Sequence, residues 1–179
     1  MGEIRSLISV DKDGKFYSNK WIEWKHVHRG LLHCQTCLVL DGCWFNYIKK
    51  PKLPLHENCH CRQIFIDKPM PNISSVAKCQ LEKFKDYIFA DKYAWNGKKA
   101  LFEKLGFTVD DSDYLKSEYE KQAVNKYCQS DYRLGRLDKH GQRINIDIVF
   151  NKENRQIIFP SGWMVRPKGI ITNNTPLGE

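Results

Sequence analysis

The feature that most constrains this chain is a cluster of cysteine and histidine residues between positions 34 and 61. Five of the seven cysteines lie in this stretch, and four of them form two close pairs, Cys34 with Cys37 and Cys59 with Cys61. Two thiolates three positions apart can face one ion from a tight turn, and a second pair completes a tetrahedral zinc site. The first residues contain no apolar segment of signal-peptide length, which favours metal ligation over disulfides. We therefore predict one structural zinc ion.

Three ligands are common to every arrangement that this spacing allows, namely Cys34, Cys37 and Cys59. The fourth is either His56 or Cys61, and the alternative to metal binding is a set of buried free thiols. A catalytic zinc of the deaminase type requires His-x-Glu followed by Pro-Cys-x-x-Cys. Here the cysteine pair comes first and His-x-Glu is absent, so a structural ion is expected.

The same residues resemble a known family. Residues 34–42 and 54–62 are similar to the C-terminal zinc-knuckle signature of Mu F-like phage head-morphogenesis proteins, which reads Cys-x-x-Cys, Leu-Asp-Gly and then Pro-Leu-His-x-Asn-Cys-Arg-Cys. His60 stands where the family has arginine, and the resemblance covers about residues 25–66. Such modules often precede a toxin domain in phage-encoded polymorphic toxins. The resemblance therefore implies a zinc-binding module followed by a toxin-like domain.

A linker separates two predicted domains. Residues 68–75 combine proline, asparagine and serine, which mark a connection between domains. We place the boundary near Ser74, with a zinc-binding module at 1–74 and a second domain at 75–179. Within the module, Asp41-Gly42 between two apolar runs predicts a hairpin, and residues 63–66 predict a strand.

The second domain is predicted to be α+β. Helices are expected at 79–89, from Asn96 to Gly106, and from Asp111 or Ser112 onward, where apolar residues recur every four positions. Alternating apolar residues then predict strands, as in Ile144-x-Ile146-x-Ile148. The expected strands are 132–137, 143–150, 156–159, 163–166 and 170–172, with turns at 138–141, 161–162 and 167–169. Helices followed by an antiparallel meander give the α+β class.

Positive charge is concentrated near the C-terminal end of the chain. The net charge is +8, and residues 121–170 contain ten Lys or Arg and four Asp or Glu. Such an excess favours anionic partners, and nucleic acid above all. No apolar run is long enough to cross a membrane, so we expect a protein of the bacterial cytoplasm with no membrane partner.

Residues that could cleave RNA lie within this basic stretch. Cleavage without a metal needs a base for the 2′-hydroxyl, an acid for the leaving oxygen and cations for the phosphate charge. His140 is the only histidine after residue 75, and histidine can take or give a proton near neutral pH. The predicted catalytic residues are His140, Lys139, Arg143 and Ser161. The predicted RNA-binding residues are Arg136, Trp163, Arg166 and Thr175, with Thr172 as a further source of a hydroxyl.

Each of these residues also has an ordinary structural explanation. His140 can be an exposed turn residue, Trp163 a core residue, Ser161 a turn former, and Arg143 part of a solvated sheet face. The alternatives stay open at this point. If the structural explanations hold for all of these residues, the expected function is non-enzymatic, that of a zinc-stabilised phage protein that binds nucleic acid or a protein partner.

Residues 80–179 resemble the metal-independent ribonuclease toxins grouped with barnase, EndoU, colicin D and RelE. The resemblance lies in helices followed by a four-stranded meander with a basic open face. Lys139-His140 and Ser161-x-Trp163 are similar to motifs of the colicin D type of active site. The resemblance implies a phage or bacterial toxin, an endoribonuclease that acts on RNA such as tRNA, with an immunity or antitoxin protein as its partner.

Overall fold

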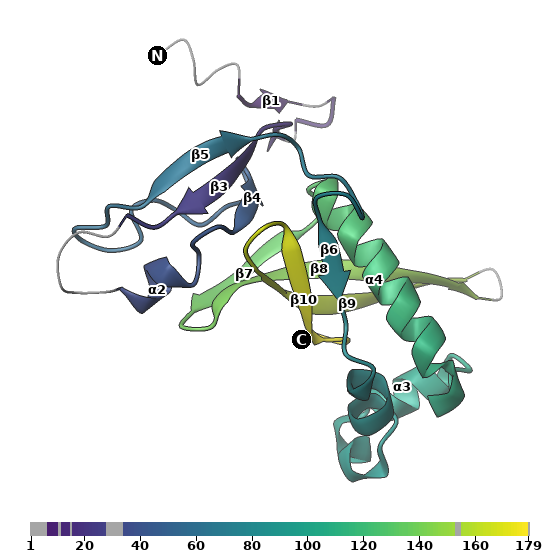
Figure 1. The fold of residues 1–179 in the computed structure, drawn as a ribbon. Coiled ribbons are helices and arrows are strands. Elements are labelled where there is room, and N and C mark those ends of the chain that lie inside the picture. Colours follow the sequence, from purple (N-terminus) through teal and green to yellow (C-terminus); the bar gives the residue numbers. More distant parts are fainter. Residues whose placement is uncertain (1–6, 11, 15, 28–33, 153–154, 179) are drawn as a thin grey trace.

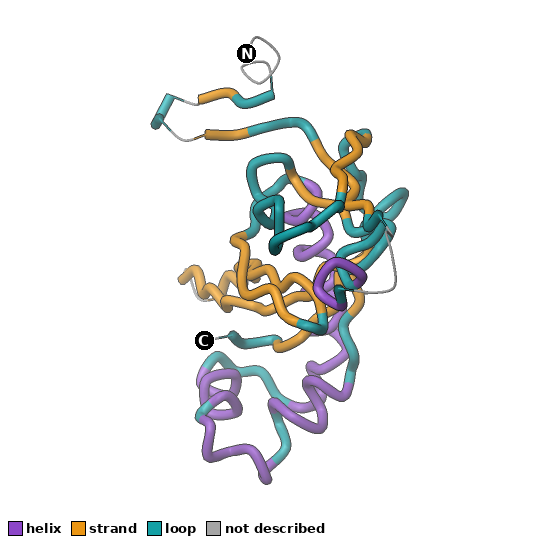
Figure 2. Tube along the Cα trace, turned by 90° about the vertical axis from the view of Figure 1, so that its left-hand side faces the viewer, coloured by secondary structure: helices purple, strands orange, loops and turns teal. Residues whose placement is uncertain are grey.

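The computed structural model describes residues 7–178 except 11, 15, 28–33 and 153–154. It contains a two-stranded, a three-stranded and a five-stranded sheet together with several helices, so the predicted α+β class is confirmed. In both the ribbon and the tube view, the hairpin near the N-terminus and the helical segment around α3 lie at opposite ends of the molecule (Figures 1 and 2). No helix among the described residues is long and apolar enough to cross a membrane.

The described strands between Ser9 and Ile66 form two small antiparallel sheets. The hairpin consists of β1 (Ser9–Val10) and β2 (Phe16–Tyr17), and the three-stranded sheet has the order β4-β3-β5. Its strands are β3 (Trp21–Lys25), β4 (Trp44–Asn46) and β5 (Arg62–Ile66). The apolar side chains of β3 are fully buried, so this strand carries the core of the module.

The predicted hairpin at Asp41-Gly42 is wrong. The apolar run before it forms the short helix α2 (Gln35–Leu38) and a turn, and β4 pairs with β3 instead. Gly42 adopts φ +73° and donates its N–H to the carbonyl oxygen of Trp24 at 2.8 Å. The left-handed glycine therefore directs the chain back along β3 rather than along the segment that precedes it.

The five-stranded sheet has the order β6-β10-β9-β8-β7. The bounds are β6 (Val76–Lys78), β7 (Arg133–Asp138), β8 (Gly141–Lys152), β9 (Arg155–Val165) and β10 (Ile170–Thr175). The last four form the predicted antiparallel meander, and β6 adds a parallel edge strand beside β10. The linker thus leads directly into the sheet.

The predicted turn at Ser161-Gly162 is also wrong, because both residues lie inside the continuous strand β9. Ser161 pairs with Ile146 and Gly162 with Asn145, without a break in register along β8. Ser161 is tolerated there because its hydroxyl donates to the Thr175 carbonyl oxygen at 3.1 Å.

Helices cover one face and one end of this sheet. The long helix α4 (Ser112–Cys128) packs against β8 and β6, and its buried residues include the predicted stripe from Leu115 to Tyr127. The end of the molecule is formed by η1 (Lys83–Ile88), η2 (Asp91–Asn96), α3 (Lys98–Lys104) and η3 (Val109–Asp111). The expected helix at 79–89 is therefore shorter. The next one begins after Gly97, whose φ of +71° separates it from η2.

Contacts join the two predicted domains. The Tyr127 hydroxyl donates to the Trp44 carbonyl oxygen at 2.7 Å, and the Tyr132 hydroxyl accepts from the Asn46 N–H at 3.0 Å and donates to the Lys49 carbonyl oxygen at 2.8 Å. Buried apolar residues of both parts belong to one core. The division at Ser74 stays a prediction, which proteolysis would test.

Candidate metal centre and candidate nucleic-acid interface

The predicted metal ligands meet at one end of the three-stranded sheet. Cys34 caps the start of α2 and Cys37 lies within it, while Cys59 and Cys61 occupy the loop that leads into β5. The Cys37 Sγ atom lies 3.1 Å from His56 Nε2 and 3.8 Å from Cys59 Sγ. The ligand atoms of Cys34, Cys37 and His56 all lie within 4.8 Å of one another, so they are close enough to hold a metal ion.

The thiols of this cluster differ in their tendency to ionise. Burial would raise the pKa of Cys34, but hydrogen bonds from the Cys37 backbone and side chain, together with His56 and the Thr36 backbone, lower this pKa. Burial also opposes ionisation of Cys59, whose pKa is lowered by backbone hydrogen bonds at Leu55 and Cys61. Burial, followed by the neighbouring thiols, raises the pKa of Cys37. Two thiols therefore ionise more readily than an ordinary thiol, toward the thiolate form that a metal requires.

The sequence prediction missed one further ligand candidate, His26. Its Nδ1 atom lies 3.9 Å from Cys61 Sγ, and these two atoms and Cys37 Sγ lie within 4.8 Å of one another. The register explains the contact, because Lys25 pairs with Arg62 and the next residues along the two strands are His26 and Cys61. Only a correct pairing of β3 with β5 could have revealed it.

His60 and Cys43 lie near the cluster but belong to neither group of close ligand atoms. His60 lines the same cavity of about 50 Å³ but belongs to neither group of ligand atoms. Cys43 is buried in the core, where its thiol lies 3.6 Å from the Val39 carbonyl oxygen, and burial raises its pKa to about 12. Cys43 is therefore a core residue.

Several predicted RNA-site residues meet at the turn between β7 and β8. Asp138 accepts a hydrogen bond from the His140 backbone N–H at 2.8 Å and faces Arg136 Nη2 at 3.1 Å and Arg143 Nη2 at 3.4 Å. The hydrogen bond from the His140 N–H is the main contact that lowers the pKa of Asp138. Both arginines lower it further, and burial opposes them. The ionised carboxylate therefore organises a turn on which Lys139 and His140 are exposed.

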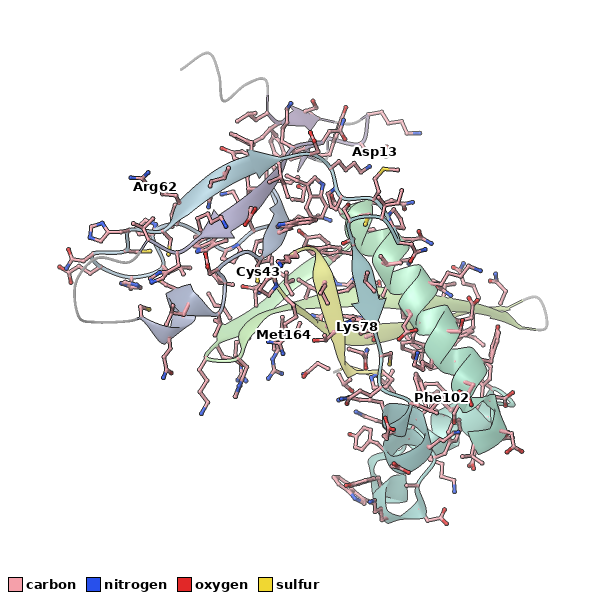
Figure 3. The ribbon with its side chains drawn as sticks, viewed as in Figure 1. Asp13, Cys43, Arg62, Lys78, Phe102 and Met164 are labelled. Carbon is pink, nitrogen blue, oxygen red and sulfur yellow. The ribbon has the colours of Figure 1, made fainter. Side chains whose placement is uncertain are left out.

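The same end of the open sheet face carries a hydroxyl and a third arginine. Arg143 pairs with Met164, Met164 with Thr172, and Thr172 with Lys78, so the four side chains share one face. Figure 3 labels Met164 and Lys78 in this row.

Arg166 connects this row with the turn. Its Nε donates to the Thr172 hydroxyl at 3.3 Å, and its Nη1 donates to the His140 carbonyl oxygen at 3.0 Å. The structure thus brings together His140, Arg143, Arg166 and Thr172. Lys139 and Arg136 lie at the rim of this group.

Ser161, Trp163 and Thr175 lie elsewhere. Ser161 and Trp163 are fully buried and pair with the core residues Ile146 and Ile144, on the face opposite Arg143. Ile146 lies six positions after His140, a distance of about 20 Å along an extended strand. The Thr175 hydroxyl donates to the Leu177 carbonyl oxygen at 2.8 Å beside a separate pocket of about 310 Å³. The expected group of Lys139-His140 with Ser161-x-Trp163 is therefore not assembled.

Comparison with known proteins identifies a family. Residues 70–173 match a domain of unknown function, DUF6883, over more than half of the chain, and the protein belongs to this family. No curated protein and no solved structure matches the chain. The matched range contains the open sheet face and the β7–β8 turn, and it excludes the cysteine cluster.

Proposed function

We propose that this DUF6883 protein binds RNA on the open face of its five-stranded sheet and cleaves it without a metal ion, while the cysteine–histidine cluster binds structural zinc. The observation that carries the RNA proposal is the position of Arg166. Its guanidinium spans from the Thr172 hydroxyl to the backbone of His140. The backbone that carries a titratable histidine, a hydroxyl and two arginines thus lie at the same end of an open sheet face.

These groups match the demands of the reaction. The 2′-oxygen attacks phosphorus and the bond to the 5′-oxygen breaks, which gives a 2′,3′-cyclic phosphate and a free 5′-hydroxyl. His140 would move one of the two protons, and Arg143 and Arg166 would balance the negative charge that develops on the phosphate oxygens. Thr172 would donate a hydrogen bond to one of those oxygens, in place of the buried Ser161.

Zinc is the metal that this ligand set favours. Cysteine and histidine side chains supply the soft sulfur and imidazole donors typical of tetrahedral structural zinc. Both groups of close ligand atoms contain cysteine and histidine alone, with no carboxylate of a described residue. Thiolate ligation couples metal binding to folding, so the purified protein should hold zinc and residues 1–74 should lose structure in a strong chelator.

The cleavage test uses the full chain and a structured RNA in buffer with EDTA. His140→Ala should lower the rate about a hundredfold or more, and Thr172→Val should lower it at least about tenfold while it preserves the shape of the side chain. Lys121→Ala is the matched control, because Lys121 is an exposed cation on α4, the helix that packs on the other face. The product should end in a 2′,3′-cyclic phosphate.

RNA binding without cleavage is the second candidate, and the burial of Ser161 and Trp163 favours it because it removes two expected site residues. Intact RNA after prolonged incubation with wild-type protein, together with tight and salt-sensitive binding, would refute cleavage and leave this candidate.

As a phage or bacterial toxin, the protein would also arrest bacterial growth. An acidic antitoxin that covers the Arg143–Arg166 face would then restore growth.

A further inference from the structure

We propose that the cysteine–histidine cluster holds two metal ions that share the Cys37 thiolate. The inference rests on the zinc binding proposed above and concerns the number of ions and the part played by His26. The potential ligand atoms fall into two groups of three within the described residues. One group is Cys34, Cys37 and His56, the other is His26, Cys37 and Cys61, and Cys37 is common to both.

The distances argue for two positions. In a tetrahedral zinc site with zinc–sulfur bonds of about 2.3 Å, two sulfur ligands lie about 3.8 Å apart. Cys37 Sγ and Cys59 Sγ lie 3.8 Å apart, so Cys59 can join Cys37 on one ion, although its thiol belongs to neither group of three. This leaves His26 Nδ1 and Cys61 Sγ, 3.9 Å apart, as a second pair of neighbours around Cys37.

The number of donors argues in the same direction. One tetrahedral ion takes four ligands, whereas six Cys and His side chains converge here. A surplus cysteine and a surplus histidine in contact with each other, together with the shared thiolate, would supply three of the four ligands of a second ion, and water would supply the fourth. A bridging thiolate supplies one bond to each ion without an additional side chain.

His26 is also held in place by the surrounding backbone. Its N–H donates to the Asp41 side chain at 2.8 Å, and Asp41 follows α2, the helix that contains Cys37. The end of β3 is thereby fixed against the turn that presents the shared thiolate. The backbone of His26 is thus fixed by two elements, β3 and the turn after α2.

The experiment is native mass spectrometry of the full chain, saturated with zinc and freed of loosely bound ions by gel filtration. Two ions per chain are expected for the wild type and one for His26→Ala. His60→Ala is the matched control, because His60 lines the same cavity outside both groups, and it should retain two. Circular dichroism would establish that each variant is folded.

The outcomes separate this inference from the proposed zinc site. One ion in the wild type would overturn the second ion and leave the structural zinc intact, whereas no ion would overturn both. Two ions in a folded His26→Ala variant would overturn the ligand role of His26. If that variant does not fold, the number of zinc ions bound by the wild type decides between one ion and two.

Discussion

Replacement of Tyr132 by phenylalanine tests whether the zinc module and the five-stranded sheet unfold together. The Tyr132 ring is almost fully buried between Trp21 and Tyr127, with centroid distances of 6.5 Å and 5.7 Å. Phenylalanine preserves this packing and removes only the hydroxyl. The change therefore isolates two hydrogen bonds that cross the predicted boundary, to the Asn46 N–H and the Lys49 carbonyl oxygen.

The expected magnitude follows from the burial of the two groups that lose their partner. A buried backbone group without a hydrogen bond costs about 1–3 kcal/mol. Asn46 is fully buried, whereas Lys49 is only half-buried and water can replace part of its lost bond. The free energy of unfolding should therefore fall by about 2–4 kcal/mol in total.

Urea denaturation followed by tryptophan fluorescence measures this change, since Trp21 contacts Tyr132 directly. With a slope of about 2 kcal/mol per molar urea, the midpoint should fall by about 1–2 M. Tyr114→Phe is the control, because the Tyr114 side chain is exposed, and its midpoint should hardly change. An equal, small shift in both variants would refute the reasoning and favour two independently folding domains.

Three further predictions concern a turn, the basic site and acid stability. Gly169→Ala should destabilise the protein by about 3 kcal/mol or more by thermal unfolding, because φ is +72° and the added Cβ would lie 2.5 Å from a carbonyl oxygen of the linker. Gly97→Ala, with φ +71° and open space, should cost only about 1 kcal/mol, and equal losses would contradict the role of the clash. Asp138→Asn should tighten RNA binding about threefold and steepen its salt dependence in fluorescence anisotropy, and weaker binding would show that the carboxylate instead organises the site. The hydrogen bond from Arg133 lowers the pKa of Asp147, although burial opposes this. The ionised Asp147 therefore stabilises the fold above the unfolded-state pKa of about 3.9, and this contribution is lost as pH falls through the lower folded-state pKa. The difference in stability between the wild type and Asp147→Asn should shrink between about pH 5 and pH 2, and a constant difference would refute the linkage.

Local patterns in the sequence determined several features of this protein. The α+β class follows from a helical stripe ending at Tyr127 and from the alternation of Ile144, Ile146 and Ile148, because each period reports which side chains of one element face the core. The spacing of Cys34 and Cys37 was likewise sufficient to predict that these two thiols face one position, since a short turn brings such a pair together whatever surrounds it.

Only the tertiary structure decided the rest, because it depends on which strands pair. Ser161-Gly162 has the composition of a turn, yet both residues lie inside β9 because each has a partner in β8. The same pairing places Ser161 in the core and puts Thr172 in one row with Arg143, and the pairing of β3 with β5 brings His26 to Cys61. A sequence pattern describes one segment at a time, whereas each of these contacts joins segments far apart in the chain whose register is fixed only when the whole sheet forms.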